Sequence, residues 1–412
     1  MKFLTLLSFF LIILELNCED SLVFVHVIFR HGNRTPEQNN LYQASPYMNE
    51  TYFKPYGFGQ LTNKGKLNAY NVGKSLRQRY SGFLDEEYNI KLINARSSDF
   101  NRTKASLQAM LAGLFPPSKD LIWLEGLNWQ PIPYTYVDRS LDKELFCFGC
   151  SNWDKNFDGY LHGSNGKPLI DSYRKTFDYL TEKTGENYND LVKTYYLYFG
   201  LEILEELNYA LPEWASEVYP YPMKNITTLH YNVMVATKTL RQMAAGYLLK
   251  KILSDTQEKI DGKFPDKKMS VWCGHENNIA ALLKILKVWN EEEIASYGSN
   301  ILMELHFIDQ KYGFKIYFSN KQSNPELLSI PGCGNFCPLD EFNVLVRNEI
   351  PTSDEICGRG NLDIIFSIHF FDTDNYFSCT TDETVVATTS SCLAVEAAVE
   401  EDESLSAVYV EA

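Results

Sequence analysis

Residues 22–36 of this 412-residue chain read Leu22-Val-Phe-Val-His-Val-Ile-Phe-Arg-His-Gly-Asn-Arg-Thr-Pro36. The first eight, up to Phe29, are apolar except for His26, and most of them are β-branched or aromatic. A run of this length and composition predicts a strand buried on both faces, as in the middle of a parallel sheet. We therefore expect a central strand of an α/β fold here, with His26 as a hydrogen-bonded residue of the core.

The predicted strand ends abruptly at Arg30-His31-Gly32-Asn33-Arg34. Guanidinium groups offer planar, permanently charged donors to phosphate oxygens, and a neutral imidazole is a competent nucleophile towards phosphorus. Gly32 lets the backbone approach another group closely. A positively charged turn after a strand is the simpler interpretation, and the remainder of the chain tests it.

Two further predicted strands also end at polar residues that precede a helix. Arg96 follows a strand at 90–95, and His275 and Glu276 follow a strand at 268–273. Ligand sites in open α/β sheets gather at the carboxyl ends of strands. We therefore expect one site with three guanidinium groups, two imidazoles and one carboxyl group around a phosphate-sized space, from Arg30, Arg34, Arg96, His31, His275 and Glu276.

The fold class predicted from this order is α/β, with a doubly wound, mostly parallel sheet, helices on both faces and an inserted, mainly helical cap domain. Helices are expected near 60–80 and 102–114, and an antiparallel strand pair at 301–308 and 314–318 with its turn at 311–313. The composition of residues 118–240 differs from that of the preceding part of the chain. Within this segment we expect a strand-like piece at 121–123 and helices at 168–183 and 188–208, and a further helix at 228–254 is expected to begin in it.

Both ends of the chain differ from its middle. Lys2 precedes an apolar core at 3–16, and Cys18 lies at the expected cleavage point, which is the pattern of a secretory signal peptide. No later run of about 18 or more apolar residues predicts a membrane anchor. The predicted division is a signal peptide at 1–18, an α/β catalytic domain at 19–125 and 241–375, a cap at 126–240 and an acidic, disordered tail at 376–412.

The formal net charge of −15 makes nucleic acid a poor partner for a broad surface contact. Besides Cys18, the chain has an even number of cysteines, which in a secreted protein favours disulfide bonds. Cys333 and Cys337 suit a small closed loop, and zinc binding is the alternative, but no second close-spaced pair lies nearby. Cys273, at the end of a buried strand, is a candidate free thiol of the core. The sequons at Asn49, Asn101 and Asn225 fit glycosylation in the secretory pathway, whereas Pro36 argues against a glycan on Asn33.

The segment 30–36 resembles the signature of the histidine acid phosphatases, a branch of the histidine phosphatase superfamily. Further segments resemble other motifs of this family in the expected order, and the resemblance covers about residues 22–357. These segments are Gly-Gln-Leu-Thr-Asn-Lys-Gly at 59–65, Arg-Ser-Ser-Asp-x-x-Arg-Thr at 96–103, Phe-Pro-Pro at 115–117 and Pro-Gly-Cys-x-x-x-Cys-Pro at 331–338.

The resemblance implies hydrolysis of phosphate monoesters in acid, with His31 as the nucleophile that forms a phosphohistidine. The implied phosphate-binding residues are Arg30, Arg34, Arg96 and His275. Glu276 is the implied proton donor to the leaving alcohol. Many family members have Asp at this position, so Glu276 keeps the carboxyl group on a longer arm. The arginines supply the charge that a metal supplies in other phosphatases, and we expect neither a metal nor a cofactor.

The resemblance further implies disulfide bonds Cys150–Cys357 and Cys333–Cys337, and it suggests a homodimer. The expected substrate is a small phosphate monoester or a phosphoprotein, and the expected location is outside the cell, in a lysosome or in a venom. Two alternatives stay open. A phytase-like inositol polyphosphate phosphatase would need more Lys and Arg at its pocket, and a catalytically weak secreted binding protein or allergen would not need the intact set of six site residues.

Overall fold

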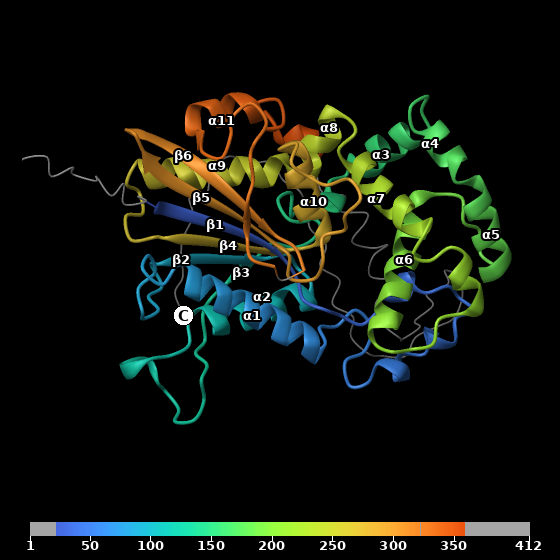
Figure 1. Ribbon diagram of the computed structural model, residues 1–412, viewed down its shortest axis with the longest axis horizontal. Coiled ribbons are helices and arrows are strands. Elements are labelled where there is room, and N and C mark those ends of the chain that lie inside the picture. Colours follow the sequence, from blue (N-terminus) through green and yellow to red (C-terminus); the bar gives the residue numbers. More distant parts are fainter. Residues whose placement is uncertain (1–21, 322, 359–412) are drawn as a thin grey trace, which may run out of the picture. The chain divides into compact units, whose positions relative to one another are not determined.

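The computed structural model describes residues 22–321 and 323–358 (Figure 1). The predicted signal peptide at 1–18 and the predicted acidic tail at 376–412 lie outside these residues. Within them, no helix is long and apolar enough to span a membrane.

A mixed sheet lies at the centre of the fold, with the strand order β3-β2-β4-β1-β5-β6-β7 and with β8 paired to β6. The parallel strands are β1 (Leu22–Arg30), β2 (Ile93–Ser97), β3 (Thr135–Tyr136) and β4 (Met269–Gly274). The antiparallel strands are β5 (Asn300–Ile308), β6 (Lys311–Ser319), β7 (Glu326–Leu327) and β8 (Cys337–Pro338). β1 is thus a central strand with β4 and β5 as neighbours, which confirms the prediction from 22–29.

Helices cover both faces of this sheet, as the predicted fold class requires (Figure 1). On one face lie α1 (Asn63–Arg79) and α2 (Asn101–Leu114). On the other face lie α9 (Tyr247–Ile260), α10 (Glu276–Ile285) and α11 (Leu339–Val346). The side chains of β1 alternate between the two layers, because Val25, Val27 and Phe29 pack in the core with α1 and α2, while Phe24 and Ile28 pack in the core with α9 and α10. This is why the β1 sequence is apolar on both faces.

The remaining helices are mostly those of the segment that we expected to be a cap. They are α3 (Trp153–Leu161), α4 (Lys167–Ser172), α5 (Arg174–Thr184), α6 (Leu191–Glu206), α7 (Met223–Met234) and the one-turn α8 (Lys238–Arg241). Figure 1 shows α3 to α7 beyond the carboxyl ends of β1 and β4. α7 contacts both α6 and α10, so this segment adjoins the helices that cover the sheet. The domain boundaries at 125 and 240 stay a prediction.

Three local predictions are wrong. The helix expected at 228–254 is interrupted after Met234, because the Thr237 hydroxyl caps a new helix by accepting from the backbone N–H of Leu240, and a π-helical turn at 242–246 precedes α9. The turn of the β5–β6 hairpin lies at Asp309 and Gln310, both with positive φ, so that 311–313 belong to β6. Residues 119–121 form a 3₁₀ turn, and 121–123 are not a strand.

Both disulfide bonds implied by the family resemblance are present, Cys150–Cys357 and Cys333–Cys337. Cys273 is a buried free thiol in β4, as predicted, and Cys147 is a second one. The other two cysteines, at 379 and 392, lie outside the described residues.

Candidate active site

The register of the parallel strands brings their carboxyl ends to one edge. Arg30 pairs with Gly274, and Ser97 pairs with Cys273, so the residues that follow all emerge at the same level. The backbone N–H of His31 donates to the carbonyl of Gly274 at 3.0 Å, which extends the β1–β4 ladder into the site. The three strand ends therefore meet as expected, and their side chains define the candidate site.

Gly32 is required by a close backbone approach. A Cβ atom built on this residue would lie 2.1 Å from the carbonyl oxygen of Gly65, and one built on Gly65 would lie 2.0 Å from the carbonyl oxygen of Asn33. The two glycines thus allow the loop after β1 to lie directly against the first turn of α1. The Gly32 N–H donates to the Ser106 hydroxyl of α2 at 3.0 Å, which anchors the same loop from the other side.

The hydrogen bonds of His31 determine which ring nitrogen is available for chemistry. Its Nδ1 lies 2.8 Å from the Gly32 carbonyl oxygen, which only accepts, so Nδ1 carries the proton. Nε2 is therefore unprotonated, and its lone pair accepts a hydrogen bond from the Nε–H of Arg102 at 3.3 Å. Burial, and then the charges of Arg102 and Arg30, hold the pKa of His31 well below its usual value. His31 is therefore a neutral imidazole with Nε2 as its nucleophilic atom.

Three buried guanidinium groups surround this imidazole. Arg30 donates to the Ala295 carbonyl at 2.5 Å and stacks on Tyr297, with 4.0 Å between its Cζ and the ring centroid. Arg34 donates to the side chain of Asn40 at 2.8 Å, and Arg102 pairs with Glu37 at 2.9 Å. Each guanidinium is thus fixed by the protein in the absence of a ligand, an arrangement suited to binding phosphate oxygens.

The structure corrects the assignment of the third guanidinium. Arg96, which we expected in the site, lies level with Trp272 in the sheet, two positions short of the edge defined by Arg30 and Gly274. Its guanidinium pairs with the buried carboxylate of Asp142 at 2.5 Å and with Glu144. Among the described contacts, none links Arg96 to His31. Arg102, the second residue of α2, occupies the place beside the nucleophile instead.

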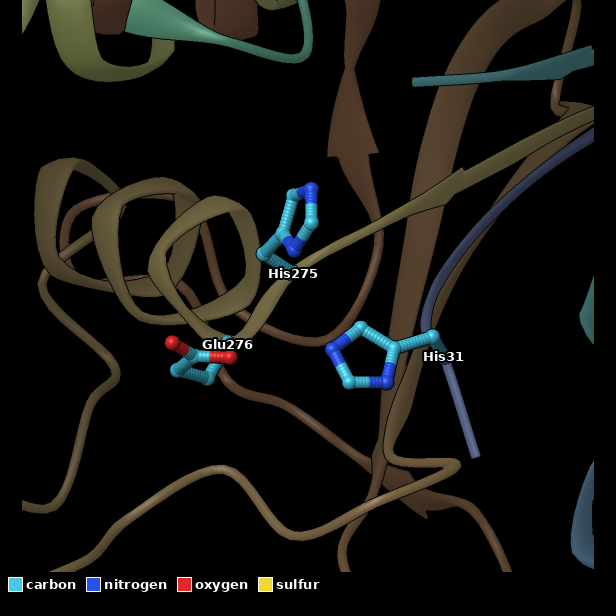
Figure 2. Close-up of side chains that lie close together, drawn as sticks. All are labelled: His31, His275 and Glu276. Carbon is cyan, nitrogen blue, oxygen red and sulfur yellow. The ribbon is translucent and has the colours of Figure 1, made fainter. Parts of the chain in front are cut away.

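His275 and Glu276 lie at the start of α10, facing the His31 ring (Figure 2). The two histidine rings are 5.4 Å apart, and Nε2 of His275 lies 3.0 Å from the Ser98 hydroxyl. Burial, and then the charge of Arg102, lowers the pKa of His275 to about 3, so it is neutral.

Glu276 is ionised beside Arg30. Burial alone would raise the pKa of this carboxyl group, but Arg30, at 3.1 Å from it, and then His275 lower the pKa to about 2. The hydroxyl of Tyr195, from α6, donates to the other carboxylate oxygen. Tyr195 is buried, and burial, followed by the charge of the Glu276 carboxylate, raises the pKa of Tyr195 well above its usual value. The candidate proton donor is therefore held between a strand residue and a helix of the segment predicted as a cap.

Nitrogen and oxygen atoms of His31, His275 and Glu276 lie within 4.8 Å of one another, a spacing that suits a metal ion (Figure 2). Arg30, Arg34 and Arg102 surround the same space. Their positive charges disfavour the binding of a metal cation there and favour the binding of an anion. The residues present thus fit a phosphate group better than a metal.

The remaining described histidines lie outside this cluster of His31, His275 and Glu276. His26 is fully buried in β1 and bonds to the Thr256 hydroxyl of α9 at 3.0 Å, which confirms it as a core residue. His230 and His306 are buried outside the cluster, and His162 is exposed.

The sequence model of the histidine phosphatase superfamily (branch 2) matches residues 21–319. The chain therefore belongs to this family. It is 35% identical over 344 residues to the venom acid phosphatase of Apis mellifera, which covers 82% of this chain and 88% of the bee protein. It is 32% identical over 343 residues to human lysosomal acid phosphatase, with 80% and 78% covered. Among solved structures, a Hafnia alvei phytase is similar with a TM-score of 0.59 at 16% identity, covering 82% of this chain and 98% of the phytase, which shows a common fold.

Sequence reasoning missed three residues of the site: Arg102, Glu37 and Tyr195. Arg102 lies within the family motif at 96–103, and its place at the start of a predicted helix was the available signal. Glu37 follows the first motif directly and is oriented by Arg102 and Arg34. Tyr195 had no signal, because it reaches the site from a distant helix.

Proposed function

We propose that this protein hydrolyses phosphate monoesters through a phosphohistidine on Nε2 of His31. The observation that carries the proposal is the neutral, Nδ1-protonated imidazole, whose free Nε2 faces a set of guanidinium groups. In the first step Nε2 forms a bond to phosphorus while the bond from phosphorus to the ester oxygen breaks, and the leaving oxygen receives a proton from Glu276. Arg30, Arg34 and Arg102 offset the charge of the phosphate oxygens throughout.

In the second step water attacks phosphorus, and Glu276, now a carboxylate, accepts a proton from it. The N–P bond breaks, and inorganic phosphate leaves with His31 neutral again. Glu276 must be protonated at the start of each turnover, although Arg30 favours its carboxylate in the empty site. A phosphate dianion bound to Arg30 competes for this guanidinium and raises the pKa of Glu276, so the donor form is expected in the substrate complex.

We further infer that the chain enters the secretory pathway. Its predicted signal peptide, its two disulfide bonds and the exposed Asn49, Asn101 and Asn225 support this inference. The homodimer suggested by the family resemblance stays a prediction.

The test is the hydrolysis of p-nitrophenyl phosphate from pH 3 to pH 8, with EDTA present, by the wild type and by His31→Ala. We expect activity in acid, unchanged by EDTA and reduced by about 10⁴-fold or more in His31→Ala. His162→Ala, which removes an exposed histidine, is the matched control. A folded wild type without activity, or a His31→Ala variant that keeps its activity, would refute the proposal.

A further inference from the structure

One helix supplies a continuous stripe of side chains to the site. α6 places Tyr195, Phe199, Glu202 and Glu206 at i, i+4, i+7 and i+11, which lie on one face of a helix. Tyr195 donates to Glu276, and the Phe199 ring lies 5.4 Å from Cζ of Arg30. Glu206 accepts from Asn33, two residues after the nucleophile, at 2.7 Å. Because three members of the stripe contact the site, Glu202 between them also faces it.

Glu202 differs from the other acidic residues around the site, because its side chain has no hydrogen-bond or ion-pair partner among the described residues. Glu37 and Glu276 pair with guanidinium groups, and Glu206 pairs with Lys64 at 3.2 Å. Within the described part of the chain, no hydrogen bond or ion pair is formed by the Glu202 side chain, although Arg30 and Arg34 act on it through space. A largely buried carboxyl group without a partner is costly unless a ligand pairs with it.

The balance of charges around the site also favours a ligand with a positively charged group. Above about pH 7, where Glu202 is a carboxylate, the charges of the basic side chains (Arg30, Arg34, Arg102 and Lys64) and of the acidic side chains (Glu37, Glu202, Glu206 and Glu276) balance before substrate binds. A phosphate dianion brings additional negative charge into this enclosed space. A positive charge on the rest of the substrate would offset it, and further negative charge, as on an inositol polyphosphate, would add to the repulsion.

We propose that Glu202 forms a subsite for a positively charged leaving group, so that the preferred substrates are phosphate monoesters of small amino alcohols. An ammonium group held there pairs with the carboxylate while the phosphate lies on the arginines. The surrounding tyrosines, Tyr198, Tyr231 and Tyr297, add aromatic rings of the kind that bind alkylammonium groups. This inference rests on the proposed phosphatase function and specifies its substrate class.

The protonation of Glu202 sets the pH at which the subsite should be tested. Burial, and then the negative charges of Glu206 and Glu276, raise the pKa of Glu202, while the positive charges of Arg30 and Arg34 lower it. The net result is a pKa of about 7. Tyr198, Tyr219, Tyr231 and Tyr297 also lie around it and are neutral over this range. The carboxylate thus predominates in the empty site only above about pH 7, and the preference for a cation weakens as the pH falls.

The experiment compares kcat/KM for O-phosphoethanolamine and for n-propyl phosphate, in which a methyl group replaces the ammonium group, at pH 7.5 with the full-length protein. We expect the wild type to favour the cationic ester by about tenfold, the effect of one partly buried charge pair. In Glu202→Gln this ratio should fall to about one. Glu217→Gln, which removes the same charge at an exposed position, should keep the wild-type ratio.

p-Nitrophenyl phosphate, whose leaving group has no positive charge, is assayed in parallel. If the wild type hydrolyses none of the three esters, the proposed function itself fails. If it hydrolyses p-nitrophenyl phosphate but gives equal values for the matched pair, or if the preference persists in Glu202→Gln, the subsite is refuted and the phosphatase function stands. Should Glu202→Gln not fold, Glu202→Asp, which keeps the charge, must retain a ratio above about three for the proposal to hold.

Discussion

Arg102 is the guanidinium closest to the nucleophile, since its Nε lies 3.3 Å from Nε2 of His31. When phosphate binds, this donor can turn to a phosphate oxygen and leave Nε2 free to attack. We expect Arg102→Ala to lower kcat/KM for p-nitrophenyl phosphate by about 10²- to 10³-fold, the usual effect of losing one donor to transition-state charge. Steady-state kinetics of the folded variant measure this.

Arg96→Ala is the informative comparison, because Arg96 is the arginine that the sequence had favoured. The Arg96→Ala substitution leaves the buried carboxylate of Asp142 without its ion-pair partner Arg96. We therefore expect the free energy of unfolding to fall by roughly 3 kcal/mol. Its kcat/KM should fall less than about tenfold. If Arg96→Ala costs more activity than Arg102→Ala, our correction of the site is wrong.

Tyr195 acts on the chemistry through Glu276 and is a positioning residue. The hydroxyl stabilises the carboxylate, so Tyr195→Phe should raise the pKa of Glu276 and keep its proton to higher pH. We expect the alkaline limb of the kcat–pH profile to move to higher pH, with kcat changed by about tenfold or less. Phe199→Leu, on the same face of α6, should change kcat without moving this limb. An unshifted limb in Tyr195→Phe would contradict the assignment.

At the level of elements, the contact between β1 and α9 makes stability depend on pH. Burial, and then the charge of Lys251, lowers the pKa of His26 to about 3, whereas the unfolded chain binds this proton near pH 6.5. The stabilisation is therefore complete above about pH 6.5 and is lost as the pH falls towards 3. Between pH 7 and pH 5 the loss from this residue is about 2 kcal/mol.

Urea denaturation at pH 7 and pH 5 tests this prediction. In His26→Gln, whose amide can still reach the Thr256 hydroxyl, the fall in the free energy of unfolding between the two pH values should be about 2 kcal/mol smaller than in the wild type. His162→Gln, at an exposed position, should leave the fall unchanged. An identical pH dependence in His26→Gln and the wild type would show that His26 is not held neutral by the fold.

The elements that could be predicted are those whose sequence pattern is local. The apolar run at 22–29 identifies β1, and Arg30, His31, Arg34, His275 and Glu276 could be placed because each lies at the end of a strand or within four residues after it. Arg96 was misplaced because sequence does not give the register of β2 against β4, and this register leaves Arg96 two positions short of the edge at which Arg30 and Gly274 lie.

Contacts from distant elements could not be predicted at all. Tyr195 and Glu202 lie on α6, whose buried residues are distributed over all faces of the helix. Its sequence pattern therefore does not identify the face that is directed to the site. The break after Met234 was missed because the cap supplied by Thr237 competes with continuation of the helix, while Ala236 and Lys238 beside it are good helix formers. Local propensity predicts that a helix exists better than it predicts its boundaries.

At the scale of the molecule, the two disulfide bonds differ most in the length of chain that they close. Cys150 and Cys357 are separated by 207 residues, so their bond ties the start of the predicted cap to the last described segment, whereas Cys333 and Cys337 are separated by 4. A cross-link stabilises mainly by restricting the unfolded chain, and the effect grows with the closed loop. The loop lengths correspond to about 5 kcal/mol for the first bond and about 2 kcal/mol for the second.

We therefore expect Cys150→Ser/Cys357→Ser to lower the free energy of unfolding clearly more than Cys333→Ser/Cys337→Ser does, as measured by guanidinium denaturation under oxidising conditions. Double variants are needed because a lone Cys150 would lie three residues from the free thiol of Cys147. Equal losses, or a larger loss for the short loop, would mean that strain or contacts in the native state outweigh the entropy of the unfolded chain.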